Sequence, residues 1–110
     1  MGKIADATFK GKFGTYAFEV YTTDTVFNSV GGVYIFSKRS IGLDGKGTHM
    51  FLYIGQTNSL RERIVNHDRL PCVRRHGVNC ICVHRDSDAN SRQRKELDLL
   101  SVNKTPCNAQ

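Results

Sequence analysis

Two short runs of aromatic and β-branched residues, separated by a glycine-rich stretch, constrain the fold of this chain more than any other feature. Residues 33–36 (Val-Tyr-Ile-Phe) follow the pair Gly31-Gly32, and residues 49–55 (His-Met-Phe-Leu-Tyr-Ile-Gly) follow three further glycines. Runs of this kind favour strands, and the glycines between them favour a turn. We therefore expect an antiparallel hairpin whose long loop covers residues 37–48.

The remaining patterns predict a small mixed domain. Residues 13–21 and 78–84 indicate further strands, and residues 1–12 indicate a mobile start. A capping box, Ser59-x-x-Glu62, begins a helix that ends before Pro71, and a last helix is predicted over 89–102 with Leu97 and Leu100 in its apolar stripe. The expected fold class is α/β (α+β), with an antiparallel three-stranded sheet flanked by helices.

The domain organisation follows from this order of elements. Residues 1–30 form an N-terminal extension that adds one strand to the sheet, and residues 31–110 form the main domain. A chain of 110 residues is close to the usual size of a single core. It leaves no room for a second domain.

The excess of basic residues indicates what kind of partner the chain binds. The chain carries 16 Lys and Arg against 10 Asp and Glu, a formal net charge of +6. Residues 1–55 contribute +2 and residues 56–110 contribute +4, and eight of the nine arginines lie in the second half. Because the guanidinium fork matches phosphate oxygens, this half favours a polyanionic partner. A basic surface without a specific partner is the alternative.

The location is expected to be cytoplasmic. No run approaches the roughly 20 apolar residues that span a bilayer. The first residues, Met-Gly-Lys-Ile-Ala-Asp, show no apolar leader segment. We therefore expect no membrane partner.

The four cysteines raise the alternative of a metal site. They include no Cys-x-x-Cys pair, and no leader segment favours disulfides. We interpret Cys80 and Cys82 as pointing to opposite faces of one strand, which disfavours a shared ion. Reduced thiols are the expected state. The alternative is a small zinc-binding interaction protein that uses Cys72, Cys80, Cys82 and His84.

An ordered set of motifs begins in the hairpin and continues to the end of the chain. Its members are, in order, Gly32-Val33-Tyr34, Tyr53-Ile54-Gly55, Arg63, His67, Glu96 and Asn108. Either tripeptide alone is a common strand sequence, whereas the whole order with these spacings is specific. The set resembles the GIY-YIG nuclease family over about residues 31–108.

The resemblance implies a metal-dependent endonuclease that hydrolyses phosphodiester bonds of DNA. It assigns the base to Tyr34, stabilisation of the pentacovalent phosphate to Arg63, and the metal to Glu96. Tyr53, His67 and Asn108 complete the implied catalytic set, with Asn108 orienting Glu96 or Tyr34. The implied cofactor is one divalent cation, Mg²⁺, for which Mn²⁺ substitutes. One carboxylate suffices for such an ion, because it keeps several waters and takes phosphate oxygens.

Substrate contacts are expected around this set. Gly55 lets substrate or the following turn approach closely. Gln56 stands where several family members carry lysine, so a general-acid role there is in doubt. The arginines expected to contact phosphate are Arg61, Arg69, Arg74, Arg75 and Arg92.

We expect no second domain for target choice, and therefore a standalone nuclease of bacterial or phage type with limited or structure-based selectivity. Single-stranded or branched DNA is the expected substrate, repair or mobile-element defence the expected role, and no obligate protein partner is evident. The alternative within the same fold is a non-catalytic nucleic-acid-binding module.

Overall fold

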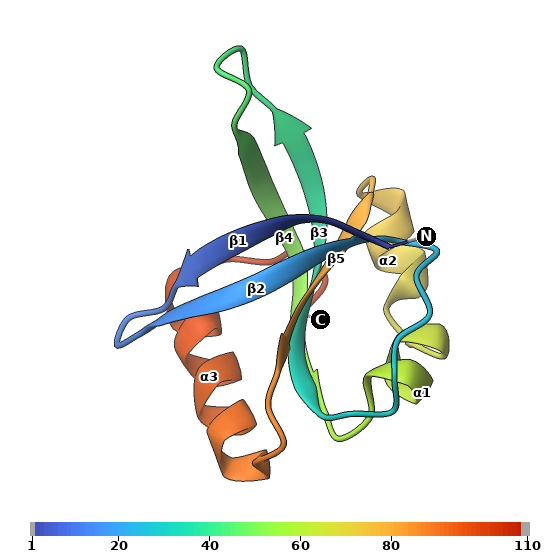
Figure 1. The fold of residues 1–110 in the computed structure, drawn as a ribbon, viewed down its shortest axis with the longest axis vertical. Coiled ribbons are helices and arrows are strands. Elements are labelled where there is room, and N and C mark those ends of the chain that lie inside the picture. Colours follow the sequence, from blue (N-terminus) through green and yellow to red (C-terminus); the bar gives the residue numbers. More distant parts are fainter. Residues whose placement is uncertain (1, 109–110) are drawn as a thin grey trace.

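The computed structural model describes residues 2–108. Within them, five strands form one antiparallel sheet in the order β1-β2-β5-β3-β4, and three helices pack on it (Figure 1). The strands are β1 (Lys3–Lys10), β2 (Thr15–Thr22), β3 (Gly32–Ile41), β4 (Gly47–Thr57) and β5 (Cys80–Arg85). The helices are α1 (Leu60–Val65), α2 (Leu70–Arg75) and α3 (Ala89–Val102). The α+β class is confirmed.

The N-terminal segment contributes two strands rather than one. β1 pairs with β2, and β2 pairs with β5, so this hairpin extends the sheet formed by the rest of the chain. The expected mobile start over residues 1–12 and the three-stranded sheet are therefore wrong. Every second residue of β1 packs inward, but two of these residues, Ala5 and Ala7, are too small to give a strong strand signal.

The hairpin of β3 and β4 forms as expected, and its strands run further than expected. The loop covers only residues 42–46, and Gly45 adopts a positive φ of 81° in it. Residues 38–40 pair with residues 48–50 in the part of the hairpin that projects beyond the sheet (Figure 1). These residues are mostly polar because little of the domain covers them, which is why the sequence pattern resembles a loop.

A β-bulge interrupts the register of this hairpin. Phe36 pairs with Tyr53 and Ser37 pairs with Phe51, so Leu52 is the extra residue. Leu52 and Tyr53 consequently both contact the same apolar cluster, although they are neighbours in the chain.

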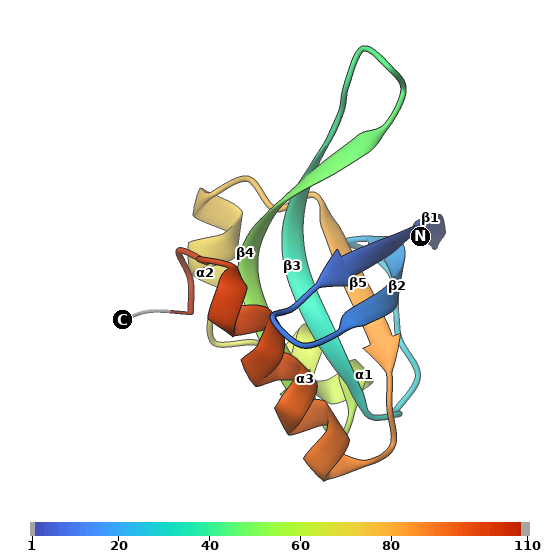
Figure 2. The same ribbon diagram turned by 90° about the vertical axis from the view of Figure 1, so that its left-hand side faces the viewer.

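Each face of the sheet carries its own apolar cluster. Tyr34 and Phe36 face α1 and α2, whereas Val33 and Ile35 face α3 with Leu99. Figure 2 shows α3 on the near side of the sheet and α1 behind it. The alternation along β3 separates these faces, because successive side chains of a strand point in opposite directions.

The helices differ from the sequence prediction at two points. α2 is an additional helix, since Pro71 occupies its first turn, where a missing N–H is tolerated. α3 has the expected bounds and is capped by Asp88, but Leu97 is exposed. Among residues 2–108, no helix is long and apolar enough to cross a membrane.

The cysteines fall into two pairs. Cys72 of α2 and Cys107 near the C-terminus form a disulfide, so the expectation of reduced thiols is wrong for these two. Cys80 and Cys82 are free thiols buried in the cluster beneath α3. They lie on the same face of β5, and the expectation of opposite faces was wrong because residues two apart on a strand share a face.

Candidate active site

Tyr34 lies at the centre of the candidate active site. It is 1% exposed, and its hydroxyl oxygen lies 2.6 Å from Nε2 of His67. The Tyr34 ring stacks on Tyr53, with centroids 6.0 Å apart, and the His67 ring stands edge-on to Tyr53 at 4.6 Å. His67 follows α1 in the turn that leads to α2. The two strands and this turn therefore bring together three of the predicted residues.

The partners of the His67 ring determine which nitrogen carries its proton. The backbone N–H of Arg69 donates to Nδ1 over 3.0 Å, so Nδ1 is an acceptor. In the neutral ring the proton is then on Nε2, which donates to the Tyr34 oxygen. The lone pairs of Tyr34 thus receive a hydrogen bond, and its own proton is free to be donated elsewhere.

Burial keeps His67 neutral. Loss of water around the ring lowers the pKa of His67 to about 4, and the positive charges of Arg63 and Arg69 add to this effect against the opposing charge of Asp68. At neutral pH the ring is therefore a hydrogen-bond donor without net charge.

Arg63 connects this buried pair to the surface. Its side chain is 36% exposed, and its guanidinium donates to Asp68 over 2.8 Å. Its positive charge also acts on the Tyr34 hydroxyl. Burial and the neighbouring Tyr53 raise the pKa of Tyr34, and the positive charge of Arg63 opposes this rise. Arg63 is thus the cationic group that both favours a Tyr34 phenolate and remains accessible to a ligand.

Gly55 makes room for the two tyrosines. It pairs with Tyr34 across the hairpin. A Cβ atom at position 55 would lie 2.6 Å from the Tyr34 hydroxyl oxygen and 2.8 Å from Cε2 of Tyr53. Since real Cβ atoms do not approach other atoms so closely, the arrangement of both rings requires glycine here.

Glu96 is on α3, the helix that packs on the sheet through Leu99, in the cluster on the other face from Tyr34. Among the described residues, none forms a hydrogen bond or an ion pair with its carboxylate, which is partly buried. Burial raises the pKa of Glu96. A desolvated carboxylate oxygen suits a hard cation such as Mg²⁺ or Mn²⁺. The described contacts do not bring Glu96 to Tyr34, Arg63 or His67.

Gln56 and Arg92 connect α3 to the strand that carries Gly55. Nε of Arg92 donates to the Gln56 side-chain oxygen over 3.0 Å, and its Nη1 donates to the carbonyl of Asp86 over 3.1 Å. Arg92 is buried, so this arginine has internal partners rather than a place on the exposed basic surface. Arg92 therefore holds against β4 the face of α3 that also carries Glu96.

Asn108 pairs with the free edge of β4. Its Oδ1 accepts from the backbone N–H of Ile54 and its Nδ2 donates to the Ile54 carbonyl, both over 2.8 Å. The expected direct orientation of Glu96 or Tyr34 by Asn108 is therefore wrong. The amide instead satisfies an unpaired residue of an edge strand, immediately between Tyr53 and Gly55.

The other arginines lie around the helices that cover the Tyr34 face. Arg61, Arg74 and Arg75 are exposed and Arg69 is half-buried. Their accessibility suits contacts with phosphate.

Sequence reasoning missed two groups that act on the site. Asp68 binds Arg63, and the backbone N–H of Arg69 sets the His67 tautomer. Asp68 directly follows His67 in the chain, but the end of α1 at Val65 determines which way it faces, and no sequence pattern marks that end.

The cysteine and histidine side chains that suit a zinc ion form two groups that share no residue with the site around Tyr34. Of the four residues expected for zinc, Cys80 and Cys82 fall in one group with His49, and Cys72 falls in another with His76 and Cys107. His84 joins neither group; its Nδ1 donates to the carbonyl of Ala17 and its Nε2 accepts from Lys95. The predicted set of four is therefore wrong.

No protein-family model, curated protein or solved structure matches this chain. The resemblance to GIY-YIG nucleases consequently stays a prediction that rests on the order of its motifs.

Proposed function

We propose that the protein is a metal-dependent endonuclease of the GIY-YIG type that hydrolyses phosphodiester bonds of DNA. The observation that carries this proposal is the meeting of Tyr34, His67 and Arg63 beside Gly55. The four positions are separated in the chain and were predicted from the motif order alone. Tyr34 and His67 are hydrogen-bonded, and the charge of Arg63 acts on both of them. An apolar core has no need of such a group.

Hydrolysis of a phosphodiester needs a base for water, positive charge beside the phosphate and help for the leaving oxygen. Tyr34 is the proposed base. Its oxygen accepts from His67 and lies beside Arg63, so both neighbours stabilise the phenolate that forms when its proton leaves. Arg63 is the proposed phosphate ligand, because its exposed guanidinium carries a fork of donors.

Asp68 gives the resting protein a counterion for Arg63. A phosphate oxygen entering the site competes with the Asp68 carboxylate for the same guanidinium. Exchange of one anionic partner for another avoids leaving an unpaired cation.

The proposed metal ligand is Glu96, whose half-buried carboxylate has no partner among the described residues. The proposal requires the substrate to contact both Arg63 and the Glu96 region of α3, and a Mg²⁺ or Mn²⁺ ion held there would then supply positive charge to the phosphate oxygens and lower the pKa of a bound water. Arg92 and Gln56 position the helix face that carries Glu96.

The proposed substrate surface consists of the accessible arginines on the Tyr34 face. No second domain is needed for this surface to bind backbone phosphates without reading bases. Single-stranded or branched DNA in the cytoplasm of a bacterium, or of a cell infected by a phage, is the substrate we propose.

The test is incubation of the full chain with single-stranded, duplex and branched DNA and with RNA, with and without Mg²⁺ or Mn²⁺. Cleavage is expected only with metal. Tyr34→Phe should lower the single-turnover rate by about 100- to 10,000-fold, and Glu96→Gln should abolish metal-dependent cleavage. Matched controls are Tyr21→Phe and Glu19→Gln, whose side chains bond to each other outside the site.

A non-catalytic nucleic-acid-binding module is the second candidate. The near-complete burial of Tyr34 favours it, since a base must reach water. Binding of DNA without cleavage under every metal condition would establish this candidate and overturn the nuclease. Metal-dependent cleavage that survives Glu96→Gln would overturn the assigned ligand alone.

A further inference from the structure

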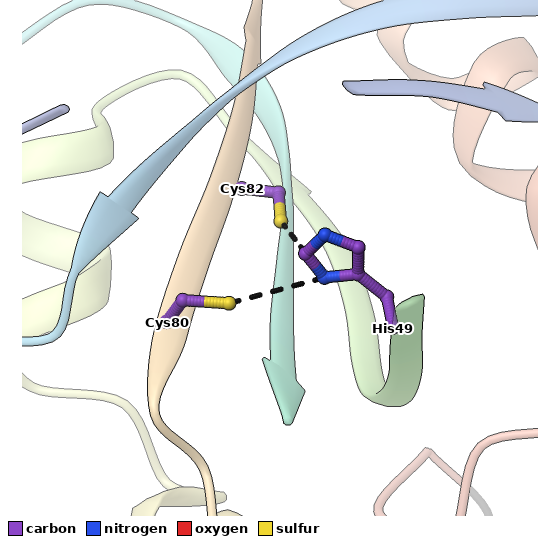
Figure 3. Close-up of side chains that lie close together, drawn as sticks. All are labelled: His49, Cys80 and Cys82. Atoms are coloured by element: carbon purple, nitrogen blue, oxygen red, sulfur yellow. Dashed lines mark hydrogen bonds between the residues drawn. The ribbon is translucent and has the colours of Figure 1, made fainter. Parts of the chain in front are cut away.

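We propose that His49, Cys80 and Cys82 form a binding site for a thiophilic divalent cation, with Zn²⁺ as the fitting ion. Figure 3 shows the three side chains converging from β4 and β5. Nδ1 of His49 lies 3.9 Å from Sγ of Cys80 and 4.0 Å from Sγ of Cys82. The three ligand atoms all lie within 4.8 Å of one another.

These separations are close to those around a tetrahedral zinc ion. Zn–S bonds of about 2.3 Å and Zn–N bonds of about 2.0–2.1 Å place ligand atoms roughly 3.6–3.8 Å apart. The observed sulfur–nitrogen distances exceed this by a few tenths of an ångström. The His49 nitrogen is therefore within a few tenths of an ångström of the separation that shared coordination with each sulfur atom requires.

The sheet register creates this cluster. Cys80 and Cys82 lie on one face of β5, and Cys80 pairs with Ser37 of the intervening strand β3. His49, on β4, pairs with Arg39, and its ring reaches across β3 to the hydroxyl of Ser37, 2.7 Å from Nδ1. A metal bound here would connect β4 to β5 over β3.

The surroundings suit a neutral metal complex. Both cysteines are fully buried among apolar side chains. Two thiolates and a neutral imidazole would cancel the charge of a divalent cation, which lowers the cost of burying it. The imidazole packs edge-on against Phe9, with ring centroids 5.2 Å apart, which restrains its orientation.

Access to the site is through His49, which is half-exposed. It lines a cavity of about 230 Å³ between β1 and the β3–β4 hairpin. Three protein ligands leave a fourth position, and water from this cavity can occupy it.

The choice of ion follows from the ligands. Thiolates and imidazole select zinc-like ions, whereas Mg²⁺ prefers oxygen. The cluster faces α3, opposite Tyr34. None of its three residues belongs to the proposed nuclease site, and the inference does not depend on that function. The other Cys/His group differs, because the disulfide between Cys72 and Cys107 occupies both of its sulfur atoms.

The test is titration of the full chain with Co²⁺, a spectroscopic substitute for Zn²⁺, followed by competition with Zn²⁺. We expect one Co²⁺ per chain, thiolate-to-cobalt charge-transfer absorption, and its loss on addition of Zn²⁺. Cys80→Ser and Cys82→Ser should abolish the absorption. His49→Gln should weaken binding at least tenfold, and because His49 is half-exposed this variant should keep its fold.

The matched control is His76→Gln, combined in a second variant with Cys72→Ser and Cys107→Ser. Both controls should bind Co²⁺ as the wild type does. Stoichiometric Zn²⁺ should also raise the thermal midpoint of the wild type and of the controls, but not of His49→Gln. The proposal is overturned if the wild type shows no thiolate–cobalt absorption, if His49→Gln binds normally, or if the control variants lose the ion.

Discussion

Nε2 of His67 lies 2.6 Å from the hydroxyl oxygen of Tyr34, 33 residues away in the chain, and the ring donates this hydrogen bond. The donor role follows from the second ring nitrogen, which already accepts from the backbone of Arg69. Burial keeps the ring uncharged at neutral pH. This hydrogen bond therefore gives Tyr34 a neutral donor in addition to the nearby positive charge of Arg63.

His67 should make stability depend on pH. The pKa of His67 is about 4 in the folded protein and near the ordinary histidine value of 6.5 in the unfolded chain. Between pH 6.5 and about 4 the unfolded chain binds more protons than the folded protein. The contribution of His67 to the free energy of unfolding is therefore complete above pH 6.5 and is lost as the pH falls toward 4. The loss amounts to about 3 kcal/mol. Urea unfolding at several pH values measures it.

His67→Gln should flatten this slope, because glutamine does not titrate. His76→Gln, at an exposed position, should retain it. Equal slopes for the wild type and His67→Gln would show that His67 is not the titrating group.

Gly55→Ala should damage the site more than a single methyl group ordinarily does. The new carbon would lie 2.6 Å from the Tyr34 hydroxyl oxygen and 2.8 Å from Cε2 of Tyr53, so both rings must move. Overpacking of this kind costs about 1–3 kcal/mol of stability. Displacement of the proposed base should lower the cleavage rate by roughly 100-fold. Gly2→Ala, where no atom lies within 4 Å, is the control and should change neither quantity.

Alanine variants of Arg63 and Arg61 should differ in what they lose, the first in cleavage rate and the second in DNA affinity. Arg63→Ala should lower the single-turnover rate by about 100- to 1,000-fold, and Arg63→Lys should recover little, because lysine lacks the planar fork. Arg61 is exposed and has no contact with Tyr34 among the described interactions. Arg61→Ala should mainly weaken binding. Equal losses of single-turnover rate in the two alanine variants would contradict the site built on Arg63.

Asn108→Ala should destabilise the edge of the sheet. It removes two hydrogen bonds to the backbone of Ile54 and leaves that N–H and carbonyl without a protein partner. The expected cost is about 1–3 kcal/mol by denaturant unfolding. Asn58→Ala, at an exposed position, should cost less than about 0.5 kcal/mol. An unchanged stability of Asn108→Ala would show that the edge pairing contributes nothing.

DNA affinity should fall steeply as salt rises, because each neutralised phosphate releases condensed counterions. Removing both Arg74 and Arg75, which are exposed, should reduce the slope of log affinity against log salt by about two. Lys3→Ala is the control, since Lys3 is already paired with Asp6 and Glu19. An affinity that stays flat from low to physiological salt would contradict a polyanionic partner.

Much of the local structure was predictable from the sequence. The aromatic and β-branched runs predicted the hairpin of β3 and β4, and the pattern over residues 89–102 predicted α3 with its observed bounds. Patterns failed where the local signal was weak or ambiguous. β1 packs small alanines inward, and Pro71 begins α2 although a proline near a helix end usually terminates it.

The candidate site shows the same division. The spacing of Tyr34, Gly55, Arg63 and His67 suggested one site, and the structure brings these four residues together. The partners of Arg92 and Asn108 were not predictable, because each lies on an element whose neighbours come from distant parts of the chain.

The sequence by itself determined that β2, β3, β4, β5, α1 and α3 form, since those choices depend on residues within a few positions of one another. Only the tertiary structure decided the strand order and register. β5 inserts between β2 and β3, and this placement brings Cys80 and Cys82 to His49 and gives each face of the sheet its own cluster. Contacts of this kind depend on burial of apolar surface over the whole chain, and no local pattern encodes them.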